Sequence, residues 1–98
     1  MSWYNDIMQQ MMRNEIELGH ALKAERLRRG MTQAELAELA HVSRAFIIGI
    51  ERGTAHRAEI GRVFRVIRAL GFGVTMLQDE TPDFTEALRQ LLGGKQDA

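Results

Sequence analysis

The sequence has 98 residues, 45% of them apolar and 27% charged, which is typical of a single globular domain. It has no cysteine, no apolar run of the roughly 18 residues that a membrane span needs, and no basic-then-apolar start, so we expect a cytoplasmic protein with no disulfide, no thiolate metal site and no membrane partner. The net charge is zero, but residues 20–72 carry +5 between two acidic ends, which favours a negatively charged partner for the middle of the chain.

The first part of the chain has the apolar spacing of helices. Residues 1–16 are expected to form an amphipathic helical extension, because apolar side chains recur there at intervals of four. Residues 17–29 predict a second helix, which Gly30 ends. The boundary between the two helices stays open. Their apolar positions are Tyr4, Ile7, Met8, Met11, Met12 and Ile16, then Leu18, Ala21, Leu22 and Leu27.

Two short capped helices follow. Thr32 is a good N-cap residue and Glu35 lies three residues later, which predicts a capping box and a helix over residues 33–40. Ser43 is a second N-cap, and a helix over residues 44–52 ends at Gly53. Two short helices joined by a tight turn form a helix-turn-helix unit. The side chains expected to face inward are Leu36, Leu39 and Ala40, then Phe46, Ile47 and Ile50.

The pattern changes after one more helix, predicted over residues 58–70 and stopped by Gly71. Residues 72–80 are rich in β-formers, and no other segment has the pattern of a strand. The backbone partner of this strand is therefore expected to be the same strand of a second copy. Residues 81–98 form an acidic tail, in which a short amphipathic turn or helix ends at Gly93 and Gly94. The helix over residues 58–70 is expected to bury Ile60, Val63, Phe64, Ile67 and Leu70 and to expose Arg62, Arg65 and Arg68 to solvent.

The run from Gly30 to Gly53, GMTQAELAELAHVSRAFIIGIERG, resembles the Cro/repressor-type (XRE) helix-turn-helix family, and the resemblance extends from about Leu18 to Leu70. Four features occur in register: the capped Thr-Gln start, Glu-Leu-Ala, Val-Ser at the second cap, and Ile-Glu-Arg-Gly at the close. The resemblance implies a mainly α, lambda-repressor-like bundle with a helix-turn-helix DNA-binding domain over residues 17–71, followed here by a short C-terminal β-strand over residues 72–80 that pairs across a dimer.

The resemblance also implies a binding site for double-stranded DNA. Residues 44–52 would form the recognition helix, whose first residues enter the major groove. Arg44 is the strongest candidate for reading a base, since a guanidinium reaches the N7 and O6 atoms of guanine. Gln33 is expected at a phosphate, as are basic residues after the helix. The full expected DNA-binding set is Gln33, Ser43, Arg44, Ala45, Ile48, Arg52, Thr54 and Arg57.

Three positions depart from the family pattern. Ile48 and Gly49 stand where recognition helices usually carry polar or basic side chains. Ile48 is expected either at a thymine methyl group or against a partner, while Gly49 has no side chain with which to read a base. His41 stands in the turn where the family often has glycine, and a left-handed backbone there would cost some stability. Specificity would then rest on Arg44, on Ser43 and on DNA shape.

Arg26 and Glu51 match family positions that form an ion pair between the first helix of the domain and the recognition helix, and this pair is expected to be structural. Nothing in the sequence resembles a nucleophile–base arrangement, a phosphate loop, a metal site or a cofactor site. We therefore expect no enzyme activity.

A strand directly after the last helix of the domain is similar to the HipB-type antitoxins, in which that strand pairs across the dimer. The first hypothesis is a homodimeric repressor that binds a palindromic operator. This repressor would also bind a HipA-like kinase toxin. Two alternatives are a stand-alone regulator without a toxin and an interaction module that has lost DNA binding, the latter favoured by Ile48 and Gly49. The expected dimerisation residues are Val74, Thr75, Met76 and Leu77.

Overall fold

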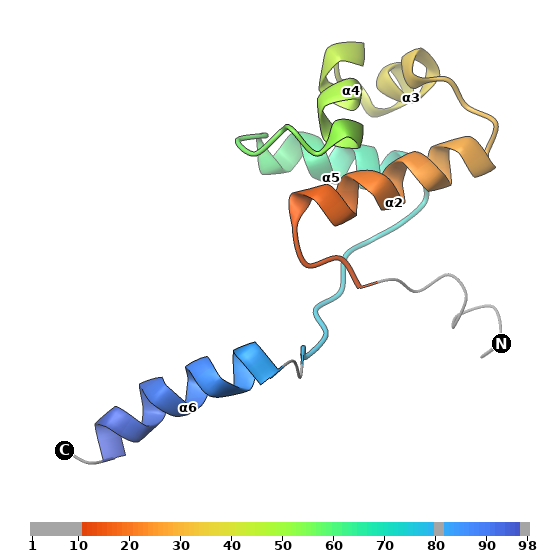
Figure 1. The fold of residues 1–98 in the computed structure, drawn as a ribbon. Coiled ribbons are helices and arrows are strands. Elements are labelled where there is room, and N and C mark those ends of the chain that lie inside the picture. Colours follow the sequence, from red (N-terminus) through yellow and green to blue (C-terminus); the bar gives the residue numbers. More distant parts are fainter. Residues whose placement is uncertain (1–10, 80–81, 97–98) are drawn as a thin grey trace, which may run out of the picture.

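The computed structural model describes residues 11–79 and 82–96, and every regular element in this part of the chain is an α-helix. α4 packs against both α2 and α3, and α3 also packs against α5. Figure 1 shows these four helices as one body, with α6 projecting away from it at the end of an extended connection. The helices are α2 (Glu15–Arg28), α3 (Gln33–Ala40), α4 (Arg44–Arg52), α5 (Ile60–Ala69) and α6 (Pro82–Gln96).

The first described helix, α2, begins at Glu15 because Asn14 caps it. The Asn14 side chain accepts a hydrogen bond of 2.9 Å from the backbone N–H of Glu17. The Glu17 carboxylate in turn accepts one of 2.8 Å from the backbone N–H of Arg13. The expected helix over residues 1–16 is therefore wrong at residues 11–14, which are not helical, while residues 15 and 16 belong to α2. Its first ten residues lie outside the described residues.

The two caps of the helix-turn-helix unit form as the sequence predicts. Thr32 and Glu35 make both bonds of a capping box, of 3.0 and 2.8 Å. Hydrogen bonding of the Glu35 carboxylate with Thr32, first with its backbone N–H and then with its side chain, lowers the pKa of Glu35. The Ser43 oxygen accepts a hydrogen bond of 3.0 Å from the N–H of Phe46 at the start of α4. Gly53 closes α4 in the left-handed conformation, with φ of 72°.

The turn between α3 and α4 has an unusual residue at its sharpest point. His41 adopts the left-handed conformation, with φ of 58° and ψ of 46°, and it is the one residue other than glycine with positive φ in the described chain. A β-carbon in this conformation lies close to the following carbonyl oxygen, which costs free energy. The departure from glycine noted in the sequence is therefore a strained position.

The core lies where α2, α3, α4 and α5 meet, and it corrects three of the expected inward positions. Leu39 is 55% exposed, because α3 turns Ala37 rather than Leu39 toward α4 and α5. Ile60 is 68% exposed and Phe64 38% exposed, while Val66 is fully buried in their place. The buried apolar residues are Leu22, Leu36, Ala37, Ala40, Ile47, Ile50, Val63, Val66, Ile67 and Leu70.

α2 and α4 approach each other closely at a glycine. Gly19 is buried within α2, and a β-carbon at this position would overlap the backbone carbonyl oxygen of Ile50 in α4. No side chain larger than hydrogen therefore fits here unless the two helices separate. The contact fixes how far α4 lies from the first helix of the body.

Residues 72–79 have no regular secondary structure in the single chain, so the expected strand is absent from the described residues. Phe72 packs under the guanidinium of Arg29, 5.1 Å from the ring centre. At the other end of the segment, Asp79 forms an ion pair of 2.8 Å with Arg13. A strand here requires a partner chain, because the segment has no neighbouring strand of its own.

The last helix is longer than the sequence predicts. α6 runs through Gly93 and Gly94 to Gln96, although these two glycines were expected to end it. Glycine has a low helix propensity, but it keeps the backbone N–H that a helical hydrogen bond needs. A pair of glycines therefore weakens a helix without ending it. None of the helices in the described chain has the length and apolar character needed to cross a membrane.

Candidate nucleic-acid interface

One face of α4 points away from the core and carries the expected reading residues. Ile47, Ile50 and Glu51 are buried, which turns the opposite side of the helix outward. On that outward side, Arg44, Ala45 and Arg52 are exposed, as is the cap residue Ser43, while Ile48 and Gly49 are half-buried. The recognition-helix residues therefore lie together on one accessible side of α4. Figure 1 shows α4 on the side of the body away from α6.

A buried ion pair holds this helix in place. Arg26 Nε lies 2.6 Å from Glu51 Oε2, and Arg26 Nη2 lies 3.0 Å from Glu51 Oε1, so the contact is bidentate. Arg26 also donates a hydrogen bond of 2.7 Å to the carbonyl oxygen of Met31, which lies in the connection between α2 and α3. The hydrogen bond with Glu51 raises the pKa of Arg26 above its usual value, against the effect of burial. The pair therefore links α2, α4 and the start of α3 in the structural role that the resemblance implies.

Gln33 joins the same network, which the sequence did not indicate. Its Nε2 donates a hydrogen bond of 3.2 Å to Oε1 of Glu51, whose carboxylate also binds Arg26. An amide nitrogen has two hydrogens, so one remains for a phosphate oxygen. Gln33 is thus held at the N-terminus of α3, where backbone N–H groups also attract an anion.

The hydroxyl groups of the site differ in what they can still donate. Ser43 uses its oxygen as an acceptor for the α4 cap, and its O–H stays available to DNA. Thr54 directs both its backbone N–H and its hydroxyl to the carbonyl oxygen of Gly49, at 3.0 and 3.3 Å. Thr54 therefore closes the C-terminus of α4 in this structure. A phosphate contact from its hydroxyl would require that bond to break.

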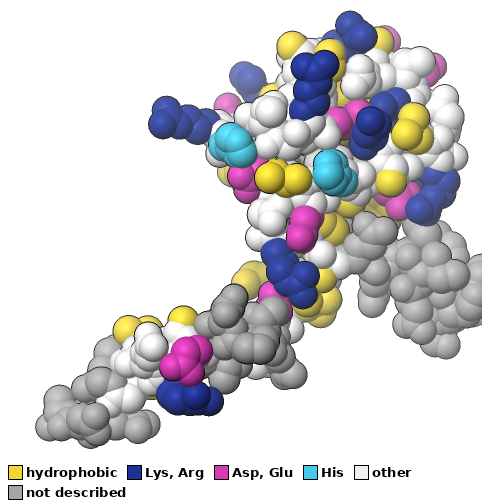
Figure 2. All heavy atoms as spheres, viewed as in Figure 1, with side chains coloured by type: hydrophobic (Ala, Val, Ile, Leu, Met, Phe, Trp, Pro, Cys, Tyr) yellow, Lys and Arg dark blue, Asp and Glu magenta, His cyan; other side chains and the backbone are white. Residues whose placement is uncertain are grey.

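Three arginines of the expected interface are available for DNA. Arg44, Arg52 and Arg57 are exposed, and within the described residues no hydrogen bond or ion pair engages them. Figure 2 shows Lys and Arg side chains distributed over the helix-turn-helix body. Arg65 differs, because its guanidinium donates a hydrogen bond of 3.2 Å to the carbonyl oxygen of Ala40 and one of 3.4 Å to that of His41. The expectation that Arg65 is simply solvated is wrong, since it caps the C-terminus of α3.

The loop after α4 is tied to the start of α2. His56 Nδ1 lies 2.6 Å from Glu15 Oε1, although the two residues are far apart in the sequence. The pKa of Glu15 is lowered, because its carboxylate accepts a hydrogen bond from the Glu15 backbone N–H and a second one from the His56 ring. Periodicity and motif spacing give no signal for this contact, because it depends on how the loop folds back over the N-terminus of α2.

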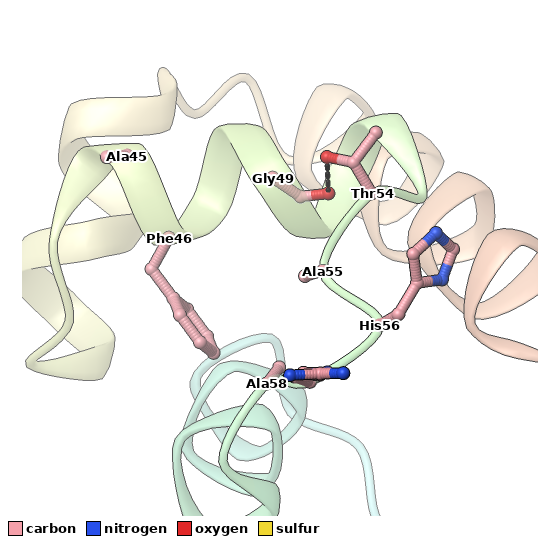
Figure 3. Close-up of a pocket in the computed structure, with 8 residues that line it drawn as sticks. Ala45, Phe46, Gly49, Thr54, Ala55, His56 and Ala58 are labelled. Carbon is pink, nitrogen blue, oxygen red and sulfur yellow. Dashed lines mark hydrogen bonds between the residues drawn. The ribbon is translucent and has the colours of Figure 1, made fainter.

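A hollow lies beside the outward face of α4. Its volume is about 480 Å³, and α4 and the following loop form its two sides. Figure 3 shows the Phe46 ring reaching from α4 toward Ala58, and Gly49 lies close to Thr54 and Ala55 of the following loop. The residues that line it are Ala45, Phe46, Gly49, Thr54, Ala55, His56, Arg57 and Ala58.

The residues expected to join two copies lie away from this interface. Val74 is 59% exposed, Met76 95% and Leu77 60%, and Thr75 is also exposed. Large apolar side chains in water are unfavourable when they are grouped in one segment. In the described part of the chain, no group of three His, Asp or Glu side chains is arranged to hold a metal ion.

Comparison with known proteins supports the motif. Residues 17–79, almost two thirds of the chain, match the model of a family described as a helix-turn-helix domain. The matched region begins within α2, includes α3, α4 and α5, and ends with the exposed segment that follows them. No curated protein matches the chain.

Proposed function

Because this chain belongs to the helix-turn-helix domain family, we propose that it is a homodimeric transcriptional repressor that binds a palindromic site on double-stranded DNA. One observation carries the proposal: the outward face of α4 presents Arg44 and Arg52 without a partner among the described residues, while the buried Arg26–Glu51 pair holds that helix rigidly. A binding surface that is ordered before DNA arrives loses less conformational entropy on binding. A DNA partner also agrees with the expected cytoplasmic location.

The proposed contacts divide into positioning and reading. Gln33, Arg52 and Arg57 would bind phosphates, which supplies affinity without sequence information. Thr54 would join them through its hydroxyl only if its bond to Gly49 breaks. Arg44 would read a guanine in the major groove, where its two terminal nitrogens match the N7 and O6 acceptors. The Ser43 hydroxyl, which remains free to donate a hydrogen bond, would contact the DNA next to that guanine.

Dimerisation is proposed through residues 74–77. These four residues are exposed and without strand partners in the single chain, and Val74, Met76 and Leu77 are apolar. A two-fold axis would pair each segment with its copy. The same axis would place two copies of α4 on one side of the DNA, about 34–36 Å apart, which is one helical turn.

The test of DNA binding is a comparison of specific and non-specific duplexes. The full chain is used to select duplexes from a random-sequence pool, and affinities for the enriched duplex and for a scrambled one are measured at several salt concentrations. Arg44→Ala should cost about 1–3 kcal/mol on the enriched duplex and little on the scrambled one. Arg89→Ala, on α6, is the matched control and should change neither affinity. Equal losses of the Arg44→Ala variant on both duplexes would exclude base reading by Arg44.

Within this function, we propose an antitoxin role with a HipA-like kinase toxin as the second partner, on the basis of the resemblance in the region after α5. A toxin reading frame next to this gene would support it, and co-expression should then give a stable complex of the two chains. A stand-alone regulator would bind DNA equally well without such a neighbour. An interaction module that has lost DNA binding would enrich no duplex at all.

A further inference from the structure

The outward face of α4 is aliphatic between its two arginines. Arg44 and Arg52 lie at the two ends of the helix, while Ala45, Ile48 and Gly49 lie between them. These three residues have no side-chain donor or acceptor with which to read a base. Hydrogen-bond recognition by α4 is therefore confined to its ends.

The fold does not require glycine at position 49. Its φ is an ordinary helical one, and a β-carbon there would lie 3.8 Å from Ala55 Cβ and 3.9 Å from Thr54 Oγ1, which are normal contact distances. An alanine would fit and would favour the helix more. Gly19 is the contrasting case, because the backbone of α4 excludes a side chain there. Glycine at position 49 therefore leaves this part of the wall of the hollow without a side chain.

This hollow has an apolar lining and a basic edge. The Phe46 ring and the methyl groups of Ala45, Ala55 and Ala58 line it (Figure 3), and the basic Arg57 is also one of its lining residues. A ligand that suits it has an apolar group attached to an anionic framework. In the major groove the apolar group on a base edge is the 5-methyl group of thymine.

We propose that Ile48 and the hollow beside Gly49 read the 5-methyl group of thymine, so that α4 recognises thymine by contact in the middle of its footprint and guanine by Arg44 at its start. This inference rests on the proposed function, since it concerns the same DNA interface. It assigns a role to both positions at which the sequence departs from polar recognition helices.

The test replaces thymine by uracil, which pairs in the same way and lacks only the methyl group. The duplex enriched from a random pool is synthesised with deoxyuridine at one thymidine position at a time, and affinity is measured with the full chain. One or two positions in each half-site should lose about fourfold, the factor expected when burial of one methyl group is lost. The other positions should change by less than about 1.5-fold, since they lose no buried methyl group.

Two variants identify the contacting residues. Gly49→Ala places a methyl group at the wall of the hollow, where the thymine methyl group would lie, and should bring the thymine-to-uracil affinity ratio close to one, while the melting temperature stays at or above that of the wild type. Ile48→Ala should reduce the same ratio. Gly61→Ala is the matched control: it is an exposed helical glycine on α5, whose added carbon meets only the Glu59 side chain at 3.5 Å, and it should leave the ratio unchanged.

The outcomes separate this inference from the proposed function. If no duplex is enriched and binding shows no sequence preference, the proposed function fails. If a duplex is enriched but no thymine position is sensitive to the loss of its methyl group, DNA recognition stands and the reading of thymine by the hollow is overturned. The same holds if Gly49→Ala leaves the ratio unchanged in a folded protein.

Discussion

At the scale of single residues, the body depends on one buried charge pair. Arg26→Ala would leave the Glu51 carboxylate buried with only the Gln33 amide as a partner. We expect a loss of about 3–5 kcal/mol of unfolding free energy, the range for a buried ion pair that loses one member. In a domain worth roughly 5–15 kcal/mol this is severe, and it is measured by urea denaturation.

The control for this prediction is the removal of both charges. Arg26→Met combined with Glu51→Leu leaves no unpaired charge and should recover part of the stability. A single Arg26→Ala variant that melts within a few degrees of the wild type would show that the pair does not stabilise the body.

A second residue-scale prediction concerns the contact between α2 and α4. Gly19→Ala places a carbon against the carbonyl oxygen of Ile50, so the two helices must separate. We expect a net loss of roughly 1–3 kcal/mol, because overpacking outweighs the gain in helix propensity. Gly61→Ala, where there is space, should instead gain about 0.5–1 kcal/mol. Equal effects of the two substitutions in thermal denaturation would contradict the close approach.

At the scale of elements, the turn between α3 and α4 stores strain at His41. His41→Gly removes the steric cost of the left-handed conformation but loosens the unfolded chain, and we expect a gain of up to about 1 kcal/mol. His41→Ala keeps the strain and should give no gain. Chemical denaturation midpoints rank the three proteins, and a glycine variant that is less stable than the alanine variant would show that the His41 side chain stabilises the turn.

Element by element, the sequence predicted best where a local signal decides the structure. The caps at Thr32 and Ser43 and the stop at Gly53 depend on neighbouring residues only, and the structure has all three. The exposure of Leu39 and Ile60 could not be predicted, because it depends on where α3 and α5 meet the other helices. The start of α2 at Glu15 was missed because an apolar stripe continues across the Asn14 cap.

The same distinction applies to the candidate site. Motif spacing placed Arg44 and Arg52 on one helix, and family positions gave the Arg26–Glu51 pair. Three other features depend on contacts between elements. They are the hydrogen bond from Gln33 to Glu51, the hydrogen bond that engages the Thr54 hydroxyl, and the hollow beside Gly49. Periodicity carries no information about such contacts.

At the scale of the whole molecule, the remaining prediction concerns assembly. Thr75→Pro removes a backbone donor from the proposed strand pair and leaves the four-helix body untouched, since residues 72–79 are irregular in the single chain. The variant should sediment as a monomer, lose affinity for the enriched duplex and keep the helical content of the wild type.

Thr75→Val keeps the backbone donor and favours a strand, so it should remain dimeric. A tight dimer of the proline variant would place the interface elsewhere. The exposed Met11 and Met12 are then the next apolar surface to examine.

The ion pair between Arg13 and Asp79 has a consequence for the path of the chain. It joins the residue just before the cap of α2 to the last described residue of the segment after α5, so the polypeptide of the helical body starts and finishes at one place. The two ends of the helical body are therefore held near each other. A circular permutant with residues 13 and 79 bridged by a short linker, and cut at the exposed Gly30 between α2 and α3, would present the same recognition face from a different order of helices.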